Sequence, residues 1–318
     1  MTNKAELSKL ASAALISGGA DAVRAYEDAA TAIGRLDASA CLADAGFREL
    51  LVLRCIATAT GTSYPGMIAL ALSDGEGEES GMSTAGFARA LREGAARSRG
   101  GALPSLSSLR ELLRLTPPTG PAPEIDELLR DANERTPPVL KAALAAQLLR
   151  GAAPPSGRDS APPAGQHLAA LAVPLLLCVG GATTDAWITL PLATAAAADA
   201  PTMPTLRDLF ATLAREARAA ERGLVAAREL CAADEIRLRD ALGRAAYSAL
   251  DVLALLRQEI VITVPEAART LGLTPPTAGA AVARLVELGI AREVTGKARS
   301  RAFAYEGIVH ALRPSAVR

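Results

Sequence analysis

The stretch TVPEAARTLGLTPPTAGAAVARLVELGI, residues 263–290, carries the clearest structural signals in the chain. Thr263 can cap a helix through its hydroxyl, and Gly272 can end that helix in a left-handed conformation. Thr274 and Gly289 bracket a second helix in the same way, and a proline follows each threonine within two residues, where a helix tolerates it. The stretch therefore predicts two helices joined by a short turn, which is a helix-turn-helix.

The apolar residues of this stretch support the same prediction. Small and branched side chains recur in the second helix at the spacing of one buried face: Ala278, Ala281, Val282 and Leu285. A facing apolar surface is available in and just after the first helix: Ala267, Ala268, Leu271 and Leu273. We expect these two sets to pack together.

The next segment, REVTGKARSRAFAY at residues 292–305, reads as two short strands around a tight turn that contains a glycine. Arg301 shares strand parity with Phe303 and Tyr305, so we expect it to lie along their apolar face near the tip. A helix-turn-helix followed by such a hairpin is a winged one. Three cations lie at or beside the predicted tip of the wing: Lys297, Arg299 and Arg301.

The charge of this region is local. The whole chain has 34 Lys and Arg against 34 Asp and Glu, whereas residues 264–314 contain seven Lys and Arg against four Glu. We expect the wing cations to contact phosphates or the minor groove of double-stranded DNA, and residues 274–284 to enter the major groove. The predicted DNA-binding residues are Thr274, Thr277, Arg284, Lys297, Arg299 and Arg301. A winged helix used for protein contact or dimerisation is the alternative.

The rest of the chain predicts a mainly α protein. Hydrophobic residues make up 50% of the sequence and aromatic residues only 3%, so the core must be built from Ala, Leu and Val. We expect a multi-helix bundle as the body and a small carboxy-terminal winged helix with one β-hairpin. Helices are predicted near residues 20–36, 44–60, 84–97, 108–115, 206–224 and 234–257. The predicted domains are 1–123, 124–257 and 258–318.

Several kinds of site find no support in the sequence. Four cysteines form no CxxC pair, and the only histidines are His167, expected to cap a helix or lie at the surface, and His310. We therefore expect no metal and no cofactor. The uncharged run 168–184 is too short for a membrane span and contains Pro174, so it predicts a buried helix, with Trp187 just beyond it as a packing anchor. We expect a cytoplasmic protein that does not bind membranes.

Three segments together resemble Fic-domain proteins. VPEAARTLGLTPPTAGAAVARLVELGIAREVTGKARSRAFAY, from Val264, resembles the winged helix that ends many of them. LAALAVPLLLCVGGATTDAWITLPLA, from Leu168, resembles the helix after the Fic active-site loop. TLRDLFATLAREARAAERGLVAARELC, from Thr205, resembles the helix that links the Fic core to its tail. The resemblance covers residues 137–310.

The resemblance implies a Fic-like body without the Fic chemistry. Fic enzymes transfer AMP through the motif HxFx(D/E)GN(G/K)R, and the matching stretch here is RGAAPPSGR, residues 150–158. Gly157 and Arg158 match the motif, but Arg150 replaces the histidine base and Pro154 replaces the acidic metal ligand. We therefore expect a non-catalytic Fic-like body, no enzyme activity, and no catalytic residues.

The sequence thus predicts a DNA-binding transcriptional regulator that acts as a homodimer, with the helices of residues 206–257 as the candidate dimer surface. One alternative is a divergent AMP transferase that uses Arg158 on phosphate. The other is a protein-interaction module of the antitoxin kind.

Overall fold

The computed structural model describes residues 19–63, 66, 84–99, 105–113, 136–151, 164–191, 205–296 and 301–313. This part of the chain is mainly helical, as predicted, and contains a three-stranded antiparallel sheet near the carboxyl end. Residues 152–158 of the segment compared with the Fic motif lie outside it, as do Lys297 and Arg299 at the predicted hairpin tip. The predicted division into three domains stays a prediction.

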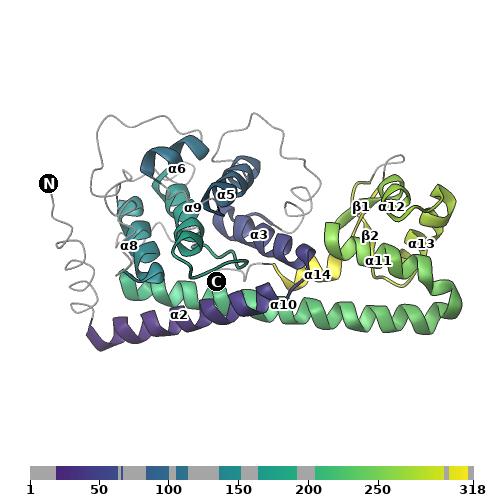
Figure 1. Ribbon diagram of the computed structural model, residues 1–318, viewed down its shortest axis with the longest axis horizontal. Coiled ribbons are helices and arrows are strands. Elements are labelled where there is room, and N and C mark those ends of the chain that lie inside the picture. Colours follow the sequence, from purple (N-terminus) through teal and green to yellow (C-terminus); the bar gives the residue numbers. More distant parts are fainter. Residues whose placement is uncertain are drawn as a thin grey trace.

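Most of the helices form a body that rests on one long helix (Figure 1). Their bounds are α2 Gly19–Cys41, α3 Ala45–Thr60, α5 Thr84–Arg99, α6 Leu106–Leu112, α8 Pro138–Gly151, α9 Ala164–Val179 and α10 Leu206–Leu242. The predicted helices near 20–36, 44–60, 84–97 and 108–115 are therefore confirmed. In Figure 1, α2 and α10 run along the lower edge of the molecule, and the other helices of the body lie above them: α3, α5, α6, α8 and α9.

The prediction of separate helices at 206–224 and 234–257 is wrong. Helix α10 continues without interruption to Leu242, a 3₁₀ turn follows at Gly243–Ala246, and α11 spans Tyr247–Glu259. The reason is local: the chain has no proline and no glycine between residues 224 and 242, so nothing there ends a helix. Gly243 ends it, with a φ of 53° that a side chain would resist.

Helices α2 and α10 lie side by side and run in the same direction. Arg218 of α10 pairs with Asp28 of α2, and Glu221 pairs with Arg35 at 3.1 Å, so the pairing advances along both helices together. Because α2 ends at Cys41, the second half of α10 extends past it toward the carboxy-terminal elements (Figure 1).

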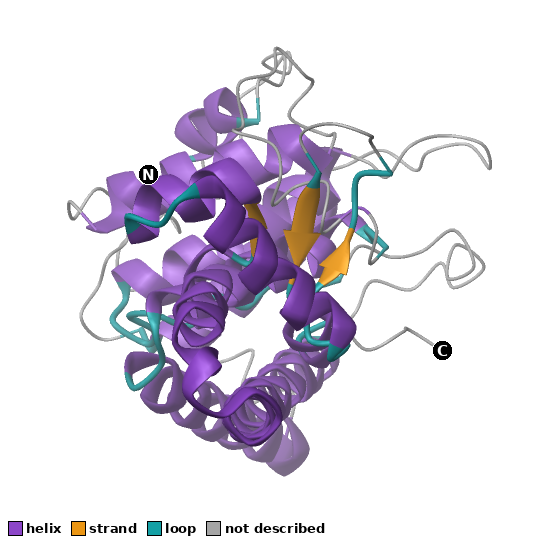
Figure 2. Cartoon of the chain, turned by 90° about the vertical axis from the view of Figure 1, so that its right-hand side faces the viewer, coloured by secondary structure: helices purple, strands orange, loops and turns teal. Residues whose placement is uncertain are grey.

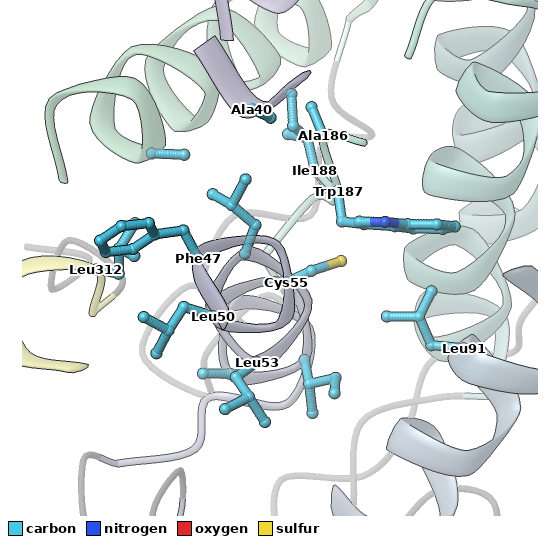
Figure 3. Packing of buried hydrophobic residues seen from close by; sticks show 14 of the residues in the cluster. Ala40, Phe47, Leu50, Leu53, Cys55, Leu91, Ala186, Trp187, Ile188 and Leu312 are labelled. Carbon is cyan, nitrogen blue, oxygen red and sulfur yellow. The ribbon is translucent and has the colours of Figure 1, made fainter. Parts of the chain in front are cut away.

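The core of the body is continuous. Figure 3 shows Phe47 and Cys55 of α3 among buried side chains that include Leu91 of α5 and Trp187. Trp187 is 3% exposed, as expected of a packing anchor. The turn before it is fixed by Asp37 of α2, whose Oδ1 accepts three successive backbone N–H bonds from residues 184–186 at 2.8–3.0 Å.

Elements α11 to α14, residues 247–313, make up what we call the carboxy-terminal unit. After α11 come β1 Val261–Thr263, α12 Val264–Leu271, α13 Pro275–Glu287, β2 Arg292–Glu293, β3 Ala302–Ala304 and α14 Glu306–Ala311. The strands form one sheet in the order β1-β3-β2, both pairs antiparallel, and the sheet is the only one among the described residues (Figure 2).

The sheet thus has one strand more than the expected hairpin. Strands β2 and β3 form the predicted hairpin, but β1 adds to its other edge, with Val261 opposite Ala304 and Thr263 opposite Ala302. The run of β-branched residues at 260–263 is the signal that marks this strand. Because β3 lies between β1 and β2, it fixes the hairpin onto the helix-turn-helix stretch.

A buried ion pair joins this unit to the body. Arg54 of α3 donates from Nη2 to Glu216 of α10 at 2.9 Å, and the two side chains are 4% and 6% exposed. Arg54 Nη1 donates to the carbonyl oxygens of Leu312 and Arg313 at 3.2 and 2.6 Å, which are at the end of α14. Every charge of this cluster is therefore partnered, and three distant segments meet at one guanidinium.

Replacing Arg54 by Met should destabilise the protein by about 3–5 kcal/mol, because Glu216 would remain buried with only the more distant Arg215, at 3.8 Å, as a cation. Urea unfolding followed by circular dichroism measures this change. Arg24→Ala is the control, since Arg24 pairs with Asp21 in water-exposed positions, and such pairs contribute about 0–1 kcal/mol. Equal effects of the two substitutions would contradict the role given to Arg54.

Candidate nucleic-acid interface

The two helices of the opening stretch begin and end at the predicted residues. Thr263 accepts the backbone N–H of Glu266 at 3.3 Å, while the Glu266 carboxylate accepts the N–H of Thr263 at 2.8 Å, a reciprocal cap. Gly272 ends α12 with a φ of 64°, and Gly289 follows α13 with a φ of 69°. The local chemistry of the sequence thus sets where α12 and α13 begin and end.

Helix α13 has one buried face and one exposed face. The predicted inner residues Ala278, Ala281, Val282 and Leu285 are all buried. Thr274, Thr277 and Arg284 are exposed, and so are Ala280 and Ala283 between them. The side of α13 that faces solvent therefore combines small residues with two hydroxyls and one guanidinium, and near its end it also exposes Val286 and the carboxylate of Glu287.

The first turn of α13, residues 275–278, offers no free backbone donor. Pro275 and Pro276 have no N–H, the N–H of Thr277 donates to the Thr274 hydroxyl at 3.4 Å, and the N–H of Ala278 donates to the Thr274 carbonyl at 2.9 Å. A helix amino end usually binds anions through such groups. Here only the N–H of Thr274 and side chains are left for that purpose, and the two hydroxyls already bond each other at 2.8 Å.

The beginning of the hairpin turn is ordered by Glu293. Its Oε1 accepts the backbone N–H groups of Thr295 and Gly296 at 2.8 and 2.9 Å, as well as the Thr295 hydroxyl. The hydrogen bonds from Thr295 are the main reason that the pKa of Glu293 lies below its usual value. Residues 297–300, with Lys297 and Arg299, continue from this fixed point outside the described part of the chain.

Arg301 follows the turn and is exposed, and its guanidinium lies 5.9 Å from the centroid of the Phe303 ring. Phe303 itself is buried in β3. The expected shared side of Arg301 and Phe303 is thus observed, and the ring holds the cation beside the sheet.

Few of the other cations of the unit are committed to carboxylates. Arg292 pairs with Glu306 at 3.0 Å. Within the described residues 264–313, the arginines that form no ion pair are Arg269, Arg284, Arg301 and Arg313. Of the four Glu of the same segment, Glu266 and Glu293 accept bonds from the backbone and Glu306 is paired. The described residues of this segment thus have five Arg against four Glu, with Glu287 exposed, so most of the positive surplus of the segment comes from Lys297 and Arg299 outside them.

Sequence reasoning missed the contacts that hold α13 on α10. Asp234 of α10 is 2% exposed and accepts hydrogen bonds from the Tyr305 hydroxyl at 2.7 Å and from Arg237 Nη1 at 2.6 Å. Arg237 Nη2 donates to the Leu288 carbonyl at 2.7 Å, at the end of α13. Burial is the largest cause that raises the pKa of Tyr305, followed by its bond to Asp234. No spacing in the sequence could show this, because the partners are 51 and 71 residues apart.

Arg257 of α11 makes a further link to the body. It donates to Asp44 before α3 at 2.6 Å and to Glu235 of α10 at 2.8 Å. Gly46 at the start of α3 lies so close to α11 that an added Cβ would be 1.7 Å from the Arg257 carbonyl oxygen. The carboxy-terminal unit is thus fixed to both α3 and α10.

His167 is buried in α9 rather than capping it or lying at the surface, so that expectation is wrong. The apolar surroundings of α9 explain this, since its neighbours from Leu168 to Leu177 are buried as well. Among the described residues, no group of three or more His, Cys, Asp or Glu is placed to hold a metal ion. The helices of the same part of the chain include none long and apolar enough to cross a membrane.

No family model matches the chain, and no curated protein matches it either.

Replacing Tyr305 by Phe should lower the free energy of unfolding by about 1–3 kcal/mol at pH 7, because Asp234 loses a buried donor. The raised pKa of Tyr305 means that its contribution is complete below about pH 10, the ordinary value for tyrosine. Above that pH it is lost by about 1.4 kcal/mol per unit, so the two proteins should converge.

Unfolding curves from pH 7 to pH 11 measure this difference. Tyr247→Phe is the control, since Tyr247 is 75% exposed and should change little at any pH. A gap between wild type and Tyr305→Phe that stays constant up to pH 11 would contradict the hydrogen bond to Asp234 as its source.

Proposed function

We propose that the carboxy-terminal unit is a winged helix-turn-helix that binds double-stranded DNA, and that the protein is a DNA-binding transcriptional regulator. The observation that carries the proposal is α13 itself: it packs on α11 and α12 through one face and turns Thr274, Thr277 and Arg284 to solvent. The element order from α11 to β3 supports the same assignment.

In this proposal α13 enters the major groove. The side chains of Gly279, Ala280 and Ala283 are short, so the axis of α13 can approach the base edges closely. Arg284 is the residue able to make a bidentate contact with guanine, and the threonine hydroxyls serve as shorter contacts. Because the first turn of α13 has no free N–H group, most phosphate contacts must come from elsewhere.

The wing supplies those phosphate contacts. Glu293 fixes the start of the turn and Phe303 contacts Arg301 at its end. The residues on both sides of the segment with Lys297 and Arg299 are therefore held in place. Cations on a hairpin held in this way contact the backbone or the minor groove beside the site that α13 reads.

We further propose that the body is a Fic-like one without catalytic function. The support is the departure of residues 150–158 from the Fic motif together with the burial of His167, which removes the nearest histidine from solvent. Incubation with labelled ATP and Mg²⁺ tests this. Transfer of label to the protein would favour the AMP transferase instead, with Arg158 on phosphate.

Replacing Lys297, Arg299 and Arg301 together by Ala should weaken binding to all DNA sequences. Three lost phosphate contacts should also reduce the slope of log affinity against log salt by about 2–3 units. Fluorescence anisotropy on one duplex at several salt concentrations measures both effects. The control replaces three exposed arginines of the body, Arg24, Arg207 and Arg222, and should leave the slope unchanged. Identical slopes in the two triple variants would remove the wing from the proposal.

Arg284→Ala should change sequence preference rather than general affinity, because the lost contact is to a base. Selection of genomic fragments on each purified protein, followed by sequencing, should show one motif position relaxed in the variant. The expected cost at that position is about 1–3 kcal/mol. Arg269→Ala on α12 is the matched control and should leave the motif intact. A uniform loss with Arg284→Ala would make Arg284 a phosphate contact, and no enriched motif with wild type would contradict a sequence-specific regulator.

A further inference from the structure

The second half of α10 has a solvent-exposed face directly opposite its buried one. Residues Ala227, Cys231, Asp234 and Leu238 are buried against the rest of the protein. On the other side the exposed positions include Val225, Glu229, Ala232, Ile236, Arg239 and Gly243. Val225 is 46% exposed and Ile236 is 57% exposed, which is high for branched apolar side chains on a regular helix.

These exposed positions follow the spacing of a coiled-coil seam. Steps of four and three residues alternate from Val225 to Arg239 on α10 and reach Gly243, the residue just after its end. This alternation is the a/d repeat of a helix that packs against another helix. The seam begins where α2 no longer runs beside α10 and covers about 27 Å of helix at 1.5 Å per residue. Its residues are small or apolar at four of the six positions, and the other two are Glu229 and Arg239.

We propose that this seam of α10 binds the same seam of a second copy of the chain in antiparallel orientation. A two-fold axis level with Asp234 places Ala232 opposite Ile236 of the second copy, so that a small residue receives a large one. The same axis places Val225 opposite Gly243, at each end of the contact. Such a contact is closed and self-complementary, as two-fold interfaces are.

The charges select the antiparallel orientation. With the axis at this level, Glu229 meets Arg239 of the second copy, and the symmetry repeats the pair. In a parallel arrangement Glu229 would face Glu229, and Arg239 would face Arg239, which is unfavourable at both levels. Within one copy Arg239 contacts Glu235 at 3.4 Å in an exposed pair, which stabilises little and leaves Arg239 able to take a new partner.

The surroundings of the seam are compatible with a second helix. Leu42, which is 78% exposed, lines an open cleft of about 240 Å³ together with Arg228 and Ala232 at the edge of the seam. A helix pair of this length is a small interface, so the dimer should be weak and its population should depend on concentration. The proposal does not rest on DNA binding, because the seam is defined by α10 alone.

Sedimentation equilibrium of the full chain without DNA, from nanomolar to high micromolar concentration, tests the seam. Wild type should dimerise reversibly, and Ile236→Glu should be monomeric throughout. Glu229→Arg and Arg239→Glu alone should each raise the dissociation constant at least tenfold, whereas the double variant should restore it. Leu148→Glu, on the exposed side of α8, is the control and should dimerise like wild type. A monomeric wild type, or a double variant as weak as either single one, would overturn the proposal.

Disulfide trapping tests the orientation in a Cys41→Ser background, which removes the exposed native thiol. Cysteines introduced together at Ala232 and Ile236 should form a covalent dimer under mild oxidation. A cysteine at Val225 alone should not, because the two copies of that position lie at opposite ends of an antiparallel pair. Efficient cross-linking of the Val225→Cys variant would establish a parallel pair and overturn the antiparallel one. Because no DNA is present, either result is independent of the proposed DNA binding.

Discussion

Two buried carboxylates on one face of α10 determine how the carboxy-terminal unit is held. Glu216 and Asp234 are 18 residues apart, which is five helical turns, so both point to the same side of the helix. Glu216 binds Arg54, which in turn binds the chain after α14, and Asp234 binds Tyr305, which comes just before α14. The segment from β3 to the end of α14 is therefore tied to α10 at both ends.

This arrangement depends on α10 being uninterrupted. A break near residue 224 would change the direction of the helix, and the two carboxylates would no longer face one segment. Because buried polar and charged groups are costly unless they are fully partnered, a wrong docking of the unit would take the Tyr305 hydroxyl from Asp234 and the two carbonyl acceptors after α14 from Arg54. The pairs thus select one orientation of the unit relative to the body, whatever their net contribution to stability.

The parts of the fold that sequence could predict are those with local causes. The caps at Thr263 and Thr274, the glycine ends of α12 and α13, and the inner face of α13 all involve residues three or four positions apart. The hydrogen bonds and side-chain contacts that produce these features lie within about one helical turn. The exposure of Thr277 and Arg284 followed from the same periodicity, so most of the candidate site could be located from the sequence.

The parts that could not be predicted depend on contacts between distant residues. The β-branched run at 260–263 favours a strand, but β1 has only three residues, too few to predict one without β3 beside it. The burial of Asp234 and His167 depends on what packs around them, and the sequence places each in an ordinary helix. The prediction of two helices in place of α10 failed for a different reason. The sequence has no glycine or proline from residue 224 to residue 242, so one long helix could have been predicted.

Ile260 shows how these distant contacts set the position of α13. It joins α11 to β1 with a φ of 67°, a conformation that a β-branched residue adopts only at a cost of about 1–3 kcal/mol. Its carbonyl accepts the N–H of Tyr305 at 3.1 Å, and its side chain is buried. Tyr305 thus fixes this bend through its backbone while its hydroxyl binds α10. The bend before α12 and α13 is therefore held by the same residue that fastens the unit to the long helix.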